Sequence, residues 1–114
     1  MKHWRIKDYP PHVRVKDAIY RVLFVRRIPG DSSRALAGCC CRSTRTIWIA
    51  LGQTPAERAS TFMHEVLHAV DFEYGLNLSH RHIYRLERPL AELTATLILH
   101  GVTTSACRSP VGNS

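Results

Sequence analysis

Residues 64 to 68 read His-Glu-Val-Leu-His, with two histidines four positions apart and a glutamate directly after the first. In an α-helix, side chains at i and i+4 lie on the same face, so His64 and His68 can offer two imidazole nitrogens to one Zn²⁺ ion. Glu65 lies beside them, where its carboxylate can take a proton from a metal-activated water. The spacing predicts a zinc centre with Glu65 as general base. The competing interpretation is a structural pair of buried histidines.

The motif lies inside a segment with clear helix boundaries. Thr54-Pro55-Ala56-Glu57 combines an N-cap threonine, a proline at the first helical position and a capping-box glutamate, and Gly75 is a natural C-terminal stop. The apolar residues between these signals recur at helical spacing: Ala59, Phe62, Met63, Val66, Leu67, Ala69, Val70 and Phe72. The motif is therefore predicted in the middle of a helix, flanked by core-facing side chains.

A catalytic zinc takes three protein ligands and leaves one position open, so a third ligand is required. We expect it on a second helix that begins after Ser79 and whose apolar stripe is Ile83, Leu86, Leu90, Leu93 and Leu97. Glu87 falls at the edge of this stripe and is the predicted third ligand, although an ion pair with Arg88 is the alternative. Glu92 faces away from the stripe. It stays a second candidate because Pro89 could kink the helix.

Three further kinds of polar side chain could serve the same site. Asp71 lies three residues after His68 and could bind zinc or, preferably, hold a ligand histidine by its second nitrogen. His80 could be a ligand, a donor to substrate, or an exposed histidine without a role. A tetrahedral oxyanion also needs a donor, for which His80, Tyr84 and Tyr74 are candidates, unless the tyrosines are packing groups.

The chain has 114 residues and a formal net charge of +7. This length favours a single domain, which we expect at residues 1–104, followed by a frayed tail at 105–114. Most of the positive charge is arginine, which favours an acidic partner or a nucleic acid. No nucleic-acid-binding motif accompanies the charge, so a solvated basic surface is the simpler explanation.

Residues 1–8 carry positive charge without an apolar run, and no stretch approaches the length of a membrane span. We therefore expect no secretory signal and a cytoplasmic protein. Three of the four cysteines are consecutive, at 39–41, so they cannot supply the paired C-x-x-C loops of a structural zinc site. Reduced thiols are expected, with one of them pointing into the core.

The predicted elements run from strands to helices. Four extended segments are expected, at residues 13–16, 18–26, 35–41 and 44–51. The first two form a hairpin, the last two a second pair, and the nearly continuous apolar run at 46–51 is typical of a strand covered by helices. These elements predict an α+β fold with a small, mostly antiparallel sheet, then the motif helix and a second packed helix.

A sheet whose last strand precedes a Thr-Pro-x-Glu-capped HExxH helix, followed by a second helix with a carboxylate, resembles the zincin metallopeptidase superfamily. The resemblance covers residues 12–100 and is closest to minimal zincins of bacteria and phages, near the ImmA/IrrE-like and SprT-like groups. It implies zinc, peptide-bond hydrolysis, and a cytoplasmic location in a bacterium or a phage-infected cell.

The resemblance also bears on single residues. The spacing from His68 to Glu87 is similar to that of the gluzincin branch, in which a glutamate on the next helix completes the site. Zincins imply an edge strand that pairs with extended substrate, and residues 44–51 would be that strand. Two features depart from related groups: Asp71 stands where metzincins have a glycine, and the sequence has no C-terminal zinc ribbon.

Two functions follow from these observations. The first is a zinc-dependent peptidase in which Glu65 is the general base. The second is a non-catalytic zinc-binding module that binds a protein or nucleic acid through its basic surface. Glu65 favours the enzyme, because a structural site has no use for a base beside its ligands.

Overall fold

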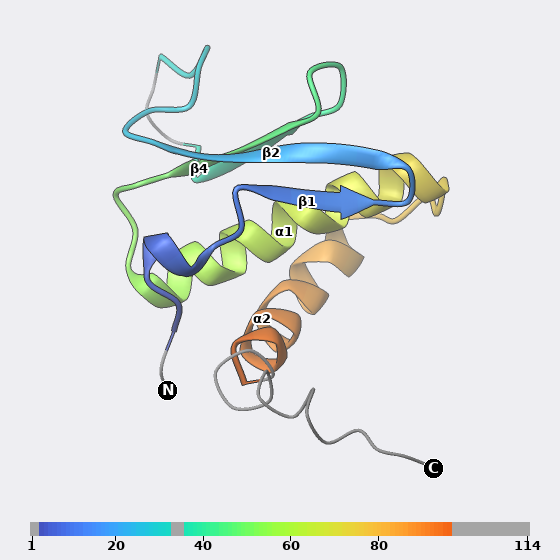
Figure 1. The fold of residues 1–114 in the computed structure, drawn as a ribbon. Helices are drawn as coiled ribbons and strands as arrows, with labels where there is room; N and C mark the ends of the chain where they lie inside the picture. Colours follow the sequence, from blue (N-terminus) through green and yellow to red (C-terminus); the bar gives the residue numbers. More distant parts are fainter. Residues whose placement is uncertain (1–2, 33–35, 97–114) are drawn as a thin grey trace, which may run out of the picture.

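The computed structural model describes residues 3–32 and 36–96. A short 3-10 helix at Ile6–Asp8 precedes the strands β1 (His12–Val15), β2 (Ala18–Val25), β3 (Gly38–Cys41) and β4 (Thr46–Ala50). The helices α1 (Pro55–Tyr74) and α2 (His80–Thr96) follow (Figure 1). The order of strands and helices agrees with the prediction. The tail predicted at residues 105–114 lies outside the described residues.

The four strands form one mixed sheet in the order β1-β2-β4-β3. β1 pairs with β2 and β3 pairs with β4 in antiparallel fashion, whereas β2 and β4 are parallel, with Val22 opposite Ile47. The predicted α+β class is confirmed in this coarse form. The parallel pair arises because β3 and β4 together form a hairpin whose second strand joins β2.

The position of β4 corrects one prediction. The strand at 44–51 was expected to pair with substrate, but β4 lies inside the sheet and both of its edges are already bonded, to β2 and β3. Its apolar sequence explains this position, since Ile47 and Ile49 are fully buried. β3 is less apolar and lies at the edge. The free strand edge on this side of the sheet therefore belongs to Gly38–Cys41.

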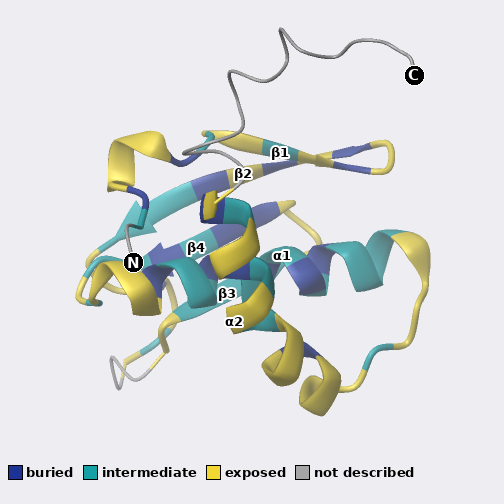
Figure 2. Ribbon diagram, turned by 90° about the horizontal axis from the view of Figure 1, so that it is seen from below, coloured by how far each residue is buried: buried dark blue, intermediate teal, exposed yellow. Residues whose placement is uncertain are grey.

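Both helices lie on the same side of the sheet: α1 packs against the sheet, and α2 packs against α1 (Figure 1). The core between the sheet and α1 contains Tyr20, Ile47, Ile49 and Phe62, and Cys40 packs against it from β3. Among Cys39, Cys40 and Cys41, which form no disulfide in the described part of the chain, Cys40 is the one that packs, partly buried, against the core. The outward side of α2 is exposed (Figure 2).

Helix α1 begins and ends where its sequence signals lie. The Thr54 hydroxyl accepts from the Glu57 N–H at 3.2 Å, and the Glu57 carboxylate accepts from the Thr54 N–H at 2.9 Å. Gly75 ends the helix with φ of 64°, a left-handed conformation that suits glycine. Pro89 lies inside α2 without ending it. In the described part of the chain, neither helix is both long and apolar enough to cross a membrane.

Candidate metal centre

The middle of α1 brings the two motif histidines together. The Nε2 atoms of His64 and His68 are 3.1 Å apart, and both rings are partly buried. This proximity follows from their i, i+4 spacing on a helix that is held by caps at both ends. Two metal-ligating nitrogens thus meet on the face of α1 that is turned toward α2 and β3.

A third histidine reaches this pair from the first residue of α2. The Nε2 atom of His80 lies 3.1 Å from that of His68, and one nitrogen from each of the three histidines lies within 4.8 Å of the others. Ligand nitrogens of a tetrahedral zinc are separated by about 3.3 Å, as follows from bonds of about 2.0–2.1 Å. His64, His68 and His80 are therefore close enough to bind a metal ion.

The connection between the helices sets the position of His80. The Asp71 carboxylate accepts from the Leu78 N–H at 2.9 Å, which ties this connection back to α1. The Ser79 hydroxyl accepts from the His82 N–H at 3.2 Å and caps the start of α2. Asp71 was predicted to hold a ligand histidine. Its described hydrogen bond goes instead to the segment that carries His80, so it acts on the site through the loop.

Glu87 lies beside the histidine group rather than in it. Its Oε1 is 2.8 Å from Nδ1 of His64, so the ring donates Nδ1–H to the carboxylate and keeps the Nε2 lone pair for the group. The three-membered group that could hold a metal ion contains His80 where the sequence prediction had Glu87. The two residues share one face of α2, but His80 is the one whose nitrogen meets those of α1.

Burial favours the neutral form of His68, which is the form that binds metal. Loss of solvent is the main cause that lowers its pKa, and the nearby His64 and His80 act in the same direction, whereas Asp71 raises it. Three ring nitrogens that converge without a proton between each pair would repel one another through their lone pairs. A bound cation removes this conflict, so the donor set fits a metal ion.

Glu65 is buried beside the histidines, with 6% of its surface exposed, and makes no hydrogen bond to another described residue. Burial raises its pKa to about 7; the neighbouring Glu87 adds to this rise and His64 opposes it. An acidic side chain without a partner in such a place is costly to stability and is typical of functional sites. Glu65 is thus a carboxyl group that exchanges its proton near neutral pH.

These groups line a cleft of about 600 Å³ between α1, α2 and the edge strand β3. Its floor carries the three histidines, Glu65 and Glu87; its walls include Tyr84 on α2 and Phe72 on α1. The remaining lining residues come from β3, the residues before it and α1: Leu36, Ala37, Gly38, Cys39, Cys40 and Thr61. The edge strand β3 therefore forms one side of the cleft.

Gly38 lets β3 approach Glu65 closely, a feature that the sequence analysis did not find. A Cβ atom at this position would lie 2.7 Å from Cγ2 of Thr61 and 3.1 Å from Oε2 of Glu65. It would also lie 3.0 Å from the carbonyl oxygen of Trp48, which is backbone and cannot turn away. Only glycine fits between the edge strand and the helix without a shift of one of them.

Substitution of Gly38 by alanine is expected to push β3 away from α1. We expect a loss of about 1–3 kcal/mol in the free energy of unfolding, as for other overpacked sites, measured by urea denaturation. Gly52→Ala is the matched control, because a Cβ there meets no atom within 4 Å. Equal stability of the Gly38 and Gly52 variants would show that the contact is not tight.

The raised pKa of Glu65 predicts a pH-dependent cost to the stability of the metal-free protein. Below an ordinary glutamate pKa of 4.5 the carboxyl is protonated in both the folded and unfolded states, so there is no cost. As the pH rises to about 7, the unfolded chain ionises first and the folded state loses stability. Glu65→Gln is expected to be as stable as the wild type at low pH and more stable by up to about 3 kcal/mol near pH 8. A constant difference across this range in denaturation experiments would contradict the argument.

The other sequence candidates lie less close to the centre. The Tyr84 ring is 5.0 Å from that of His64 and lines the cleft, although 63% of its surface is exposed. Tyr74 lies under the Lys16 ammonium, at 5.8 Å. Glu92 is exposed on α2 and does not line the cleft. Phe72, at 6.1 Å from His68 and nearly parallel to it, was read from the sequence only as a core residue.

No family model, curated protein or solved structure matches this chain. The function proposed below therefore depends on the geometry of the site and on the chemistry of its residues.

Proposed function

We propose that the protein is a zinc-dependent peptidase with a zincin-like fold, in which His64, His68 and His80 hold the metal. The observation that carries this proposal is the position of Glu65, a buried carboxyl group without a partner beside three converging imidazole nitrogens. A structural metal site needs the histidines alone. A hydrolytic site needs a base next to them and a cleft that admits substrate, and both are present.

Zinc is the metal of choice for this donor set. Three neutral imidazoles suit a borderline-soft ion, and three protein ligands with one open position are the pattern of catalytic zinc. When bound, zinc would supply a Lewis acid that makes water acidic near neutral pH and polarises the carbonyl of the substrate. Glu87 would hold His64 in the correct tautomer through its hydrogen bond to Nδ1.

Glu65 would act as the general base and then as the general acid. Its carboxylate takes a proton from the attacking water and gives it to the amine that leaves when the C–N bond breaks. Burial raises the pKa of Glu65, which strengthens it as a base, whereas the charge of a bound zinc ion would favour its ionised form. Tyr84, at the mouth of the cleft, is the candidate donor to the oxyanion.

The free edge of β3 would align the substrate. An extended peptide can add to an exposed strand through main-chain hydrogen bonds, and Gly38–Cys41 is the edge strand next to Glu65. Gly38 brings this edge within contact of the Glu65 carboxylate. A peptide carbonyl paired at this position would therefore lie beside the base. The free thiols of β3 suit a reducing compartment such as the cytoplasm.

The test is cleavage of a mixed peptide library by the zinc-loaded chain, with products identified by mass spectrometry. We expect new termini that disappear when a chelator removes the metal and return when zinc is added. Under the alternative, a non-catalytic module that binds a partner through its basic surface, zinc is retained but no peptide is cut. An absence of zinc-dependent cleavage over the whole library would favour that alternative.

A further inference from the structure

Several arginines near the cleft lack an acidic partner. Among the described residues the arginine ion pairs are Arg5 with Asp8 and Arg45 with Glu73. No ion pair is formed by four exposed arginines that lie on the β3–β4 turn and on α2: Arg42, Arg81, Arg85 and Arg88. Their charge is available to a ligand.

The three arginines of α2 form a stripe on an exposed side of the helix, next to the side that lines the cleft. The residues of α2 that line the cleft are His80, Tyr84 and Glu87. Each of them is followed directly in the sequence by one of the arginines, at positions 81, 85 and 88. At about 100° per residue, the exposed Tyr84 lies between His80 and the arginines, whereas the buried Ile83 lies on the other side of His80. The arginines therefore lie beyond Tyr84, on the exposed side of α2 next to the residues that line the cleft.

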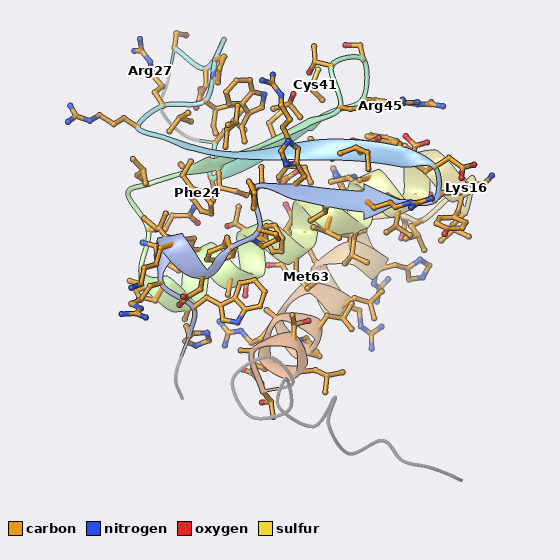
Figure 3. All side chains as sticks on the ribbon, in the orientation of Figure 1. Lys16, Phe24, Arg27, Cys41, Arg45 and Met63 are labelled. Carbon is orange, nitrogen blue, oxygen red and sulfur yellow. The ribbon has the colours of Figure 1, made fainter. Side chains whose placement is uncertain are left out.

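Arg42 lies at the opposite wall. It belongs to the turn between β3 and β4, which follows Cys41, the last residue of β3, and ends at Arg45 (Figure 3). Its guanidinium carbon is 5.7 Å from the centre of the Phe72 ring, and Phe72 lines the cleft next to His68. This contact holds the charge of Arg42 at the rim of the cleft, beside the end of the edge strand.

The acidic groups of the cleft do not neutralise these charges. Glu65 is buried on the floor, Glu87 accepts from His64, and the Asp71 carboxylate accepts from the Leu78 N–H. The exposed Glu92, one turn after Arg88, offsets one of the three charges on α2, so net positive charge remains there as well as at Arg42. A ligand in the cleft therefore meets arginines on two sides.

We propose that the cleft selects an acidic stretch of polypeptide, whose Asp or Glu side chains pair with Arg42 at one wall and with the arginine stripe Arg81, Arg85 and Arg88 at the other. This inference rests on the proposed function and names the substrate class of the same site. A polypeptide is favoured over a nucleic acid because the free edge of β3 offers main-chain hydrogen bonds in the register of an extended peptide. The arginines then select among peptides by side-chain charge.

The experiment measures binding apart from cleavage. The full chain with Glu65→Gln is loaded with zinc, and fluorescence anisotropy is recorded with a labelled peptide that alternates Glu with apolar residues and with a twin in which Gln replaces each Glu. We expect the Glu peptide to bind about tenfold more tightly or better at low salt, and the difference to shrink as salt screens the charges.

Variants locate the preference on the rim. Arg42→Gln is expected to weaken binding of the Glu peptide by about three- to fivefold, in the range of exposed charge pairs. The combined change of Arg81, Arg85 and Arg88 to Gln is expected to weaken it further. Arg14→Gln is the matched control, because Arg14 lies on β1 at the far edge of the sheet and removes the same charge. All these arginines are exposed, so the fold is not at risk.

Three results would overturn the inference. The first is equal or undetectable binding of the Glu and Gln peptides, and the second is a loss of Glu-peptide affinity in Arg14→Gln equal to that in the rim variants. The third is displacement of the Glu peptide by a single-stranded oligonucleotide that the same rim variants bind less well. Its failure is distinct from that of the proposed function. Cleavage of the library without a preference for acidic sequences would reject the substrate class alone. A preserved preference for the Glu peptide without cleavage by the wild type would reject the peptidase alone.

Discussion

Replacement of Glu65 by glutamine is expected to lower zinc-dependent peptide cleavage by about 10²- to 10⁴-fold, the range that general acid–base catalysis contributes. Glutamine keeps the shape of the side chain but cannot take the proton of the attacking water. The three histidines are untouched, so zinc should stay bound. Cleavage rates and metal content, measured on the same sample, check both halves of the expectation.

The matched control is Glu92→Gln. Glu92 carries the same charge but is exposed on α2, outside the cleft. This variant should cleave at the rate of the wild type. If Glu65→Gln cleaved as fast as Glu92→Gln, Glu65 would not be the base and the mechanism proposed above would be wrong.

The second large effect is expected for His80. Its replacement by alanine removes one of three nitrogens that could hold the metal. Loss of an outer partner, a residue that only hydrogen-bonds to a metal ligand, lowers metal affinity by about 10- to 100-fold, and we expect the loss of His80 to lower zinc affinity by more than this. Glu87→Gln should fall within that outer-partner range, because it weakens only the hydrogen bond to His64. Competition with a chromogenic chelator measures both affinities.

His82→Ala is the control for this comparison. His82 lies on the same turn of α2 but is exposed and does not line the cleft. We expect its zinc affinity to equal that of the wild type. A greater loss in Glu87→Gln than in His80→Ala would reverse the assignment and support the ligand set first predicted from the sequence.

The contrast between His80 and Glu87 shows where sequence reasoning ends. The two residues lie two helical turns apart, so periodicity places both on one face of α2 and cannot choose between them. The choice depends on the path of the chain between the helices, where Gly75 and Asn77 adopt left-handed conformations and Asp71 ties Leu78 to α1. That path depends on tertiary contacts.

Helix α1, in contrast, follows from local signals. Its capping box, its initial proline and the glycine after it act within a few residues, and its observed bounds agree with them. The strand order does not follow in this way. The first hairpin could pair with either strand of the second hairpin. It pairs with β4, because this position in the middle of the sheet buries Ile47 and Ile49.

The role of Gly38 was hidden for the same reason. A glycine before three cysteines gives no sign of what lies opposite, and its function is visible only from the approach of Thr61 and Glu65 on α1. The position of α1 and the proximity of His64 and His68 could thus be predicted from the sequence. The third histidine and the edge strand required the packing of elements that are distant in the chain.

A crystal structure of the zinc-loaded chain, with the metal located by its anomalous scattering, tests the proposed metal centre most directly. We predict one zinc ion bonded at about 2.0–2.1 Å to Nε2 of His64, His68 and His80. Glu87 should remain hydrogen-bonded to Nδ1 of His64, and Glu65 should lie free beside the fourth position. A zinc ion bonded to a Glu87 oxygen with His80 turned away, or no zinc between these histidines, would contradict the central claim.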